Sequence, residues 1–149
     1  MNLKTIPSLL LAAVLLPLPA FAEQDIEALV ASKRAVEMSY RELMHIMGNS
    51  LNLMQTGLVS QNKELVEQGA NIIFTHPAPK EKPWKIMRQE DQDAFKKVLL
   101  SYDKVLDDRT KDILSASRQK DWVAASESLA QLQYACVSCH MQWKHKAQP

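Results

Sequence analysis

Apolar side chains recur every three or four residues along most of this chain, which is the period of an α-helix. Two long stretches without proline, residues 23–76 and 84–148, carry this period. Each stretch is long enough for two helices joined by a short turn, and the proline-rich segment 76–83 would connect the two hairpins. The pattern therefore predicts an all-α fold, an antiparallel four-helix bundle.

The four expected helices follow from the apolar period and from a few local signals. The first is expected to run without a break from about Gln24 into the mid-fifties. The second should occupy about residues 61–75, and the third should run from about Asp91 to Arg118. Asp121 has a side chain suited to an N-cap, so we expect the fourth helix to begin there.

The first 22 residues have the three regions of a secretory signal peptide. Lys4 gives a cationic start, residues 6–18 are apolar, and Ala20-Phe21-Ala22 is a small-residue cleavage site. The apolar run is too short to span a bilayer. We therefore expect cleavage after Ala22, one domain over residues 23–149 without a membrane span, and export to a bacterial periplasm.

Composition narrows the possible functions. The 18 Lys and Arg residues nearly balance the 17 Asp and Glu residues, so the chain lacks the basic field that nucleic-acid binding needs.

Only three glycines occur, which is too few for the many turns of an all-β chain. No catalytic base, nucleophile or substrate pocket can be identified, so we do not expect an enzyme. The two cysteines exclude a disulfide-stapled scaffold and need an explanation of their own.

The two cysteines belong to Cys136-Val137-Ser138-Cys139-His140, which has the C-x-x-C-H spacing of c-type haem attachment. In such sites both thiols form thioether bonds with the porphyrin, and the imidazole ligates the iron. On a helix these three side chains share one face, so they can all reach a single flat cofactor. The motif predicts one covalent haem c on Cys136 and Cys139, with His140 as proximal ligand near the C-terminal end of the last helix.

Three other uses of a cysteine pair fit less well. A thioredoxin-type dithiol opens a helix, whereas Cys136 is expected well inside one. A zinc site needs further ligands at a spacing that the other three histidines do not have. A disulfide between Cys136 and Cys139 would strain the helix and would leave His140 without a role.

An exported chain of four helices with a single C-x-x-C-H motif near its end resembles the cytochrome c′ family of class II c-type cytochromes. The resemblance covers residues 23–149 and includes Trp143-Lys144, which matches the aromatic and basic pair that follows the family's proximal histidine. Arginine is more usual than lysine at the second of these positions. The resemblance implies a periplasmic monohaem protein that passes single electrons to redox partner proteins, as a monomer or a homodimer.

The resemblance also places a distal iron ligand on the first helix. Met44, with Gly48 four residues later, matches the family's Met-or-Leu position, although Tyr40 stands where the family has arginine. A Met44 thioether opposite His140 would give six-coordinate iron of raised potential, which suits electron transfer and resembles the low-spin members of the family.

Two neighbouring side chains are alternative distal ligands. Met47 lies nearer the centre of the apolar face, where a methionine usually fills the core. His45 would bind iron well but projects toward solvent. We favour Met44, which the apolar period places on the same side of the helix as Met47.

Two other functions remain open from the sequence alone. With no protein ligand on the distal side, the site would bind or scavenge nitric oxide or carbon monoxide, as the resemblance implies for five-coordinate members. A protein without haem could instead handle metals or bind other proteins, with methionine thioethers as soft ligands. The candidate thioethers are those of Met38, Met44, Met47 and Met54.

Overall fold

The computed structural model describes residues 26–148, so the predicted signal peptide lies outside the described residues. The described chain is mainly helical, with one pair of two-residue strands, and the predicted all-α class is confirmed. Its elements in chain order are α1 (Ile26–Ser32), β1 (Ala35–Val36), α2 (Tyr40–Val59), α3 (Lys63–Thr75), β2 (Ala78–Pro79), the 3₁₀ turn η1 (Gln89–Asp91), α4 (Gln92–Arg118), α5 (Trp122–Trp143) and the 3₁₀ turn η2 (Lys144–Lys146).

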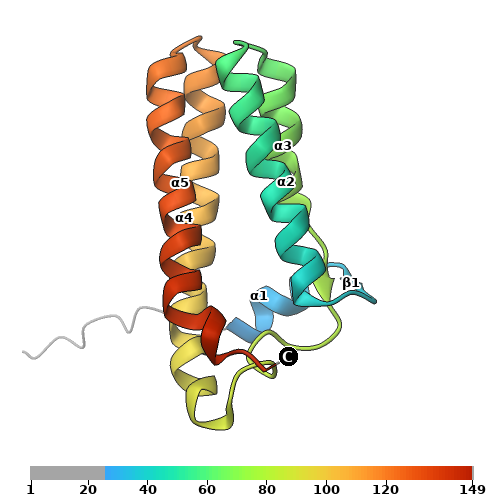
Figure 1. The fold of residues 1–149 in the computed structure, drawn as a ribbon. Helices are drawn as coiled ribbons and strands as arrows, with labels where there is room; N and C mark the ends of the chain where they lie inside the picture. Colours follow the sequence, from blue (N-terminus) through green and yellow to red (C-terminus); the bar gives the residue numbers. More distant parts are fainter. Residues whose placement is uncertain (1–25, 149) are drawn as a thin grey trace, which may run out of the picture.

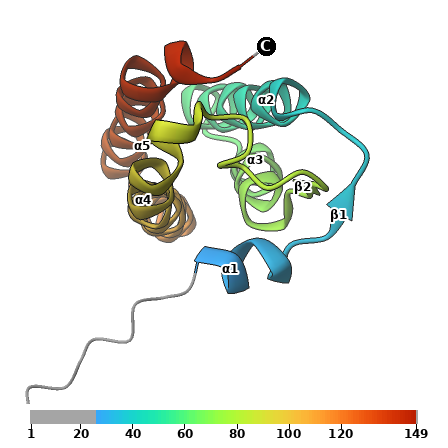
Figure 2. The ribbon, with the colours of Figure 1, turned by 90° about the horizontal axis from the view of Figure 1, so that it is seen from below.

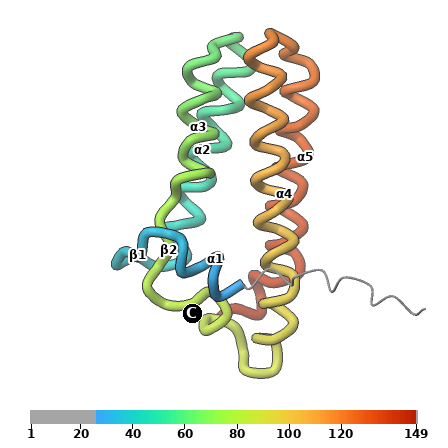
Figure 3. The backbone as a smooth tube through the Cα atoms, turned by 180° about the vertical axis from the view of Figure 1, so that it is seen from behind, coloured from blue at the N-terminus to red at the C-terminus, as the bar shows by residue number. Residues whose placement is uncertain are grey.

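The four long helices form two hairpins that stand side by side (Figure 1). α2 packs on α3 and α4 packs on α5, and the hairpins meet through α3 with α4 and α2 with α5. The turns 60–62 and 119–121 lie together at what we call the turn end. The opposite, crossover end holds α1, the strand pair, segment 76–91 and η2. Figure 3 shows the hairpins diverging toward the crossover end, and Figure 2 shows α1 along one side of this end, beside α3 and α4.

Three of the four predicted helices have the expected limits. α3, α4 and α5 match the predicted second, third and fourth helices to within about two residues. Asn62 and Asp121 cap α3 and α5, because each side chain accepts a hydrogen bond from the backbone N–H three residues later, at 3.1 and 3.0 Å. Gln61 and Lys120 precede these caps with φ values of 52° and 60°, which turns the chain sharply between helices.

The prediction of one unbroken first helix is wrong. The chain forms α1, leaves the helical conformation at 33–39 and restarts as α2. A capping box starts α2: the Ser39 hydroxyl accepts from the Glu42 N–H at 3.2 Å, and the Ser39 N–H donates to the Glu42 carboxylate at 2.6 Å. This Ser-x-x-Glu pattern satisfies backbone groups at a new helix start, and the apolar period continues across the break without revealing it.

The chain between α1 and α2 is tied to the segment after α3. β1 pairs with β2 in parallel, with Ala35 opposite Ala78. The Tyr40 hydroxyl donates a hydrogen bond to the Glu81 carbonyl at 2.6 Å, and Lys80 forms an ion pair with Glu37. These contacts fix the start of α2 relative to the crossover.

The turn end holds a closed apolar core. Its side chains come from all four long helices and are at most 4% exposed: Met54, Leu58, Val66, Ala70, Ile73, Ile113, Ala125, Leu129 and Leu132. Gly69 lets α2 and α3 approach, because a Cβ at this position would lie 2.7 Å from the carbonyl oxygen of Ser50. The Ser50 hydroxyl closes the same contact by donating to the Gly69 carbonyl at 2.6 Å.

A smaller cluster closes the crossover end. It joins residues from α1, segment 76–91, α4 and α5: Ile26, Trp84, Met87, Phe95 and Trp143. Cys139, Leu99 and Tyr102 pack against it but are only partly buried. Within residues 26–148, no helix is long and apolar enough to cross a membrane.

Candidate functional site

The C-x-x-C-H motif lies in the C-terminal half of α5 and puts its cysteines on the helix face that points inward. At about 100° per residue, Cys136 and Cys139 share this face with the buried side chains of Leu129, Leu132 and Trp143. Both cysteines are free and half-buried. Cys139 also packs against the crossover-end cluster. The two thiols therefore face the interior on the part of α5 near the crossover end.

His140 lies at the edge of the same face, about 40° around the helix from Cys136. Its imidazole is exposed, and no hydrogen bond to it is present within residues 26–148. The helix thus brings together the three side chains that the motif predicts for haem binding, two for covalent attachment and one for ligation of the iron. An imidazole without a protein partner is available to a metal.

Burial raises the pKa of both cysteine thiols, and the neighbouring Cys136 raises that of Cys139 further. Both groups are therefore protonated thiols at neutral pH. A thioredoxin-type dithiol needs the opposite, a thiol with a lowered pKa at the start of a helix. This pair lacks both properties, which agrees with the sequence argument against a redox dithiol.

The three candidate distal ligands occupy different environments on α2, a helix that contacts α5. Met47 is partly buried and packs against the turn-end core. His45 is exposed, as predicted. Around the helix axis, Met44 lies between Met47 and His45. It is 43% exposed, so its side chain points less directly into the structure than the apolar period predicts. Its thioether is not needed to fill the core.

Trp143 carries an unsatisfied polar group. Its side chain is buried, at 4% exposure, yet Nε1 has no hydrogen-bond partner among the residues that the structure describes. Phe95 packs edge-on against the indole with ring centroids 5.2 Å apart, and the Lys146 Nζ lies 4.7 Å from the indole centroid. Buried indole N–H groups normally have an acceptor. A bound group that brings an acceptor to this end of α5 would satisfy Trp143.

A haem would fit both features. The inward-facing thiols would form its thioether bonds, and one of its carboxylate side chains could accept from the unsatisfied N–H. The sequence identified Trp143 only as the aromatic residue that follows His140. Its missing acceptor depends on how α4, α5 and η2 pack, which no local pattern in the sequence reveals.

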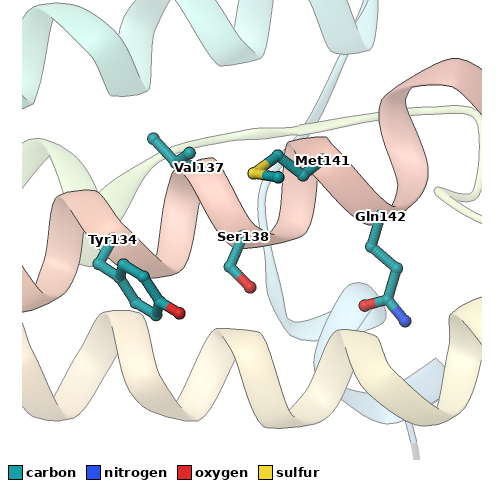
Figure 4. Close-up of a pocket in the computed structure, with 5 residues that line it drawn as sticks. All are labelled: Tyr134, Val137, Ser138, Met141 and Gln142. Carbon is teal, nitrogen blue, oxygen red and sulfur yellow. The ribbon is translucent and has the colours of Figure 1, made fainter.

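A shallow groove of about 380 Å³ lies on the outer side of α5 (Figure 4). Its lining residues are Tyr134, Val137, Ser138, Met141 and Gln142. The groove includes both middle residues of the motif but neither cysteine. The groove therefore lies apart from the thiols. Two of its apolar side chains are strongly exposed, Tyr134 at 75% and Met141 at 76% of their surface.

The described part of the chain contains no cluster of the common nitrogen, oxygen and thiolate metal ligands. No three His, Cys, Asp or Glu side chains of residues 26–148 gather closely enough to hold a metal ion. Met54, one of the thioethers considered for soft-metal binding, is fully buried in the turn-end core.

Comparison with known proteins gives no independent assignment. No protein-family model matches this chain, and neither a curated protein nor a solved structure is significantly similar to it. The functional argument therefore depends on the motif and on the surroundings of its side chains.

Proposed function

We propose that this protein is a periplasmic c-type cytochrome that transfers single electrons through one covalently attached haem. The observation that carries the proposal is the C-x-x-C-H motif on the inward face of α5, with both thiols half-buried. Cys136 and Cys139 would hold the haem, and His140 would ligate its iron. When bound, the haem would supply a one-electron iron couple.

The fold offers suitable surroundings for this role. In the proposal, the two hairpins are the halves of an antiparallel four-helix bundle of the cytochrome c′ type, with the haem near the C-terminal end of α5. The hairpins diverge toward the crossover end (Figure 3), and the cysteines belong to the half of α5 near that end. The partly buried side chains of Leu99, Tyr102 and Cys139 lie toward that end. They would provide partly buried side chains beside the attached haem.

Met44 is the proposed distal ligand. Met47 already packs against the turn-end core, and His45 faces solvent. The long, unbranched side chain of Met44 lies at the margin of the apolar face and can reorient at little cost to packing. Met44 and His140 together would give a low-spin site suited to electron transfer.

The 43% exposure of Met44 also supports a second candidate function. If this side chain stays at the surface and neither Met47 nor His45 takes its place, His140 would be the only axial protein ligand. The iron could then take up nitric oxide or carbon monoxide. No comparable observation favours a haem-free, metal-handling protein.

Two matched substitutions on α2 separate electron transfer from gas binding. The full chain would be produced in a bacterium able to attach haem, and visible spectra would be recorded for the wild type, Met44→Ala and Met47→Ala. We expect low-spin spectra from the wild type and Met47→Ala, and a high-spin spectrum from Met44→Ala. A high-spin wild type that binds carbon monoxide would favour the gas-binding function. Protein without covalent haem would overturn both.

A further inference from the structure

We propose, on the basis of the haem attachment proposed above, that Trp143 Nε1–H donates a hydrogen bond to a carboxylate side chain of the haem, and that the Lys146 ammonium stabilises the negative charge of that carboxylate. Trp143 would then position and tune the haem rather than serve only as apolar packing. This role is separate from the thioether bonds and from the iron ligands.

The Trp143 indole supplies a buried hydrogen-bond donor. Trp143 is buried in the crossover-end cluster, and its Nε1 has no acceptor within the described chain. A buried donor without an acceptor is costly, so native structures rarely keep one. A donor of this kind next to the motif points to an acceptor that arrives with the bound group.

Trp143 also lies close to the motif along α5. It follows Cys139 by four residues on α5 and therefore lies one helical turn farther along the same face. Phe95 holds the indole edge-on, and Lys146 lies over its ring. A haem attached to Cys139 would be held beside this part of α5. Its carboxylates would then meet the indole at a higher effective concentration than a free anion in solution would.

Lys146 brings a positive charge to the Trp143 indole. The Lys146 Nζ lies 4.7 Å from the Trp143 ring centroid and also forms an ion pair with Asp91 Oδ1 at 2.7 Å. The Lys146 side chain is about one-third exposed, so its charge is only partly screened by solvent. A nearby ammonium favours the ionised form of a carboxyl group. An ionised carboxylate is the stronger acceptor for an indole N–H.

The direct test compares haem-loaded wild type with Trp143→Phe, which keeps an aromatic ring and removes the N–H. Resonance Raman spectroscopy would monitor the bending band of the haem carboxylates, and a redox titration would give the reduction potential. We expect the band to shift in Trp143→Phe. We also expect a lower potential, because a less compensated carboxylate charge disfavours the reduced, more negative haem. Trp122→Phe, at the other end of α5, should change neither quantity.

An unchanged carboxylate band in haem-loaded Trp143→Phe would overturn the proposal, with a buried water as the alternative acceptor. If Trp143→Phe does not fold, Lys146→Gln supplies the second test, because it should shift the band and lower the potential in the same direction. No change in that variant would equally overturn the proposal. Wild type that never attaches haem would instead contradict the proposed function itself.

Discussion

The two ends of this molecule are built from the same four long helices but are packed differently. At the turn end, Met54, Val66, Ile113 and Leu132 are completely buried. Toward the crossover end the hairpins diverge, both cysteines are half-buried, and Met44 is exposed. The turn end is thus the more tightly packed half, and under the proposed function the other half would provide the side chains that hold the haem.

Helix α2 shows the contrast within one element. Met54, near its C-terminus, is fully buried, and Met44, near its N-terminus, is 43% exposed. The two glycines of α2 also differ, in the space that surrounds them. A Cβ at Gly48 would meet no atom within 4 Å, whereas one at Gly57 would lie 2.7 Å from the backbone nitrogen of Val66. Equal substitutions at the two ends should therefore have unequal effects.

The largest effect is expected from truncating the two α2 methionines. Met54→Ala removes a fully buried side chain and should lower the free energy of unfolding by about 2–5 kcal/mol. Met44→Ala should change it by no more than about 0.5 kcal/mol. Both would be measured by urea unfolding in a Cys136→Ser/Cys139→Ser background that cannot attach haem. Equal losses at the two positions would contradict this difference in packing between the two ends.

A glycine pair gives an intermediate effect with opposite signs. Gly69→Ala would place a methyl group against the Ser50 carbonyl and should destabilise the fold by about 1–3 kcal/mol. Gly48→Ala meets open space within a helix and should stabilise it by about 0.5–1 kcal/mol. Thermal unfolding of both variants would check the signs. A destabilised Gly48→Ala would show that α2 is as tightly packed there as at the turn end.

A smaller loss than those of Met54→Ala and Gly69→Ala concerns the N-cap of α2 at the crossover end. Ser39→Ala removes the hydroxyl that accepts from the Glu42 N–H and should cost about 1 kcal/mol at neutral pH. The Ser39 N–H and hydroxyl both donate to the Glu42 carboxylate and lower its pKa. Their contribution to stability is present above the usual pKa of glutamate and is lost as the pH falls through the lowered value.

Urea unfolding across the acidic range would test this pH dependence. Ser39→Ala keeps the backbone donor, so it should show a weaker loss of stability on acidification than the wild type. Asn62→Ala removes the uncharged cap of α3 at the turn end and serves as the control, which should lose as much stability on acidification as the wild type does. The account of the capping box would be wrong if Ser39→Ala lost as much stability on acidification as the wild type does.

The sequence predicted the parts of the fold that depend on local signals. The apolar period and the N-cap at Asp121 located α5, and the prolines located the connection between hairpins. The break before α2 was missed because the apolar period continues across it, although the Ser39-x-x-Glu42 pattern could have revealed it. The exposure of Met44 and the unsatisfied Trp143 N–H depend on how distant elements pack, which periodicity does not describe.

The most direct test of the central claim is the intact mass of the protein purified from the periplasm of a bacterium that attaches c-type haem. The proposal predicts the mass of residues 23–149 plus one haem that denaturation does not remove. The Cys136→Ser/Cys139→Ser variant should have only the mass of the corresponding polypeptide. Wild-type protein with no covalently attached haem would contradict the claim.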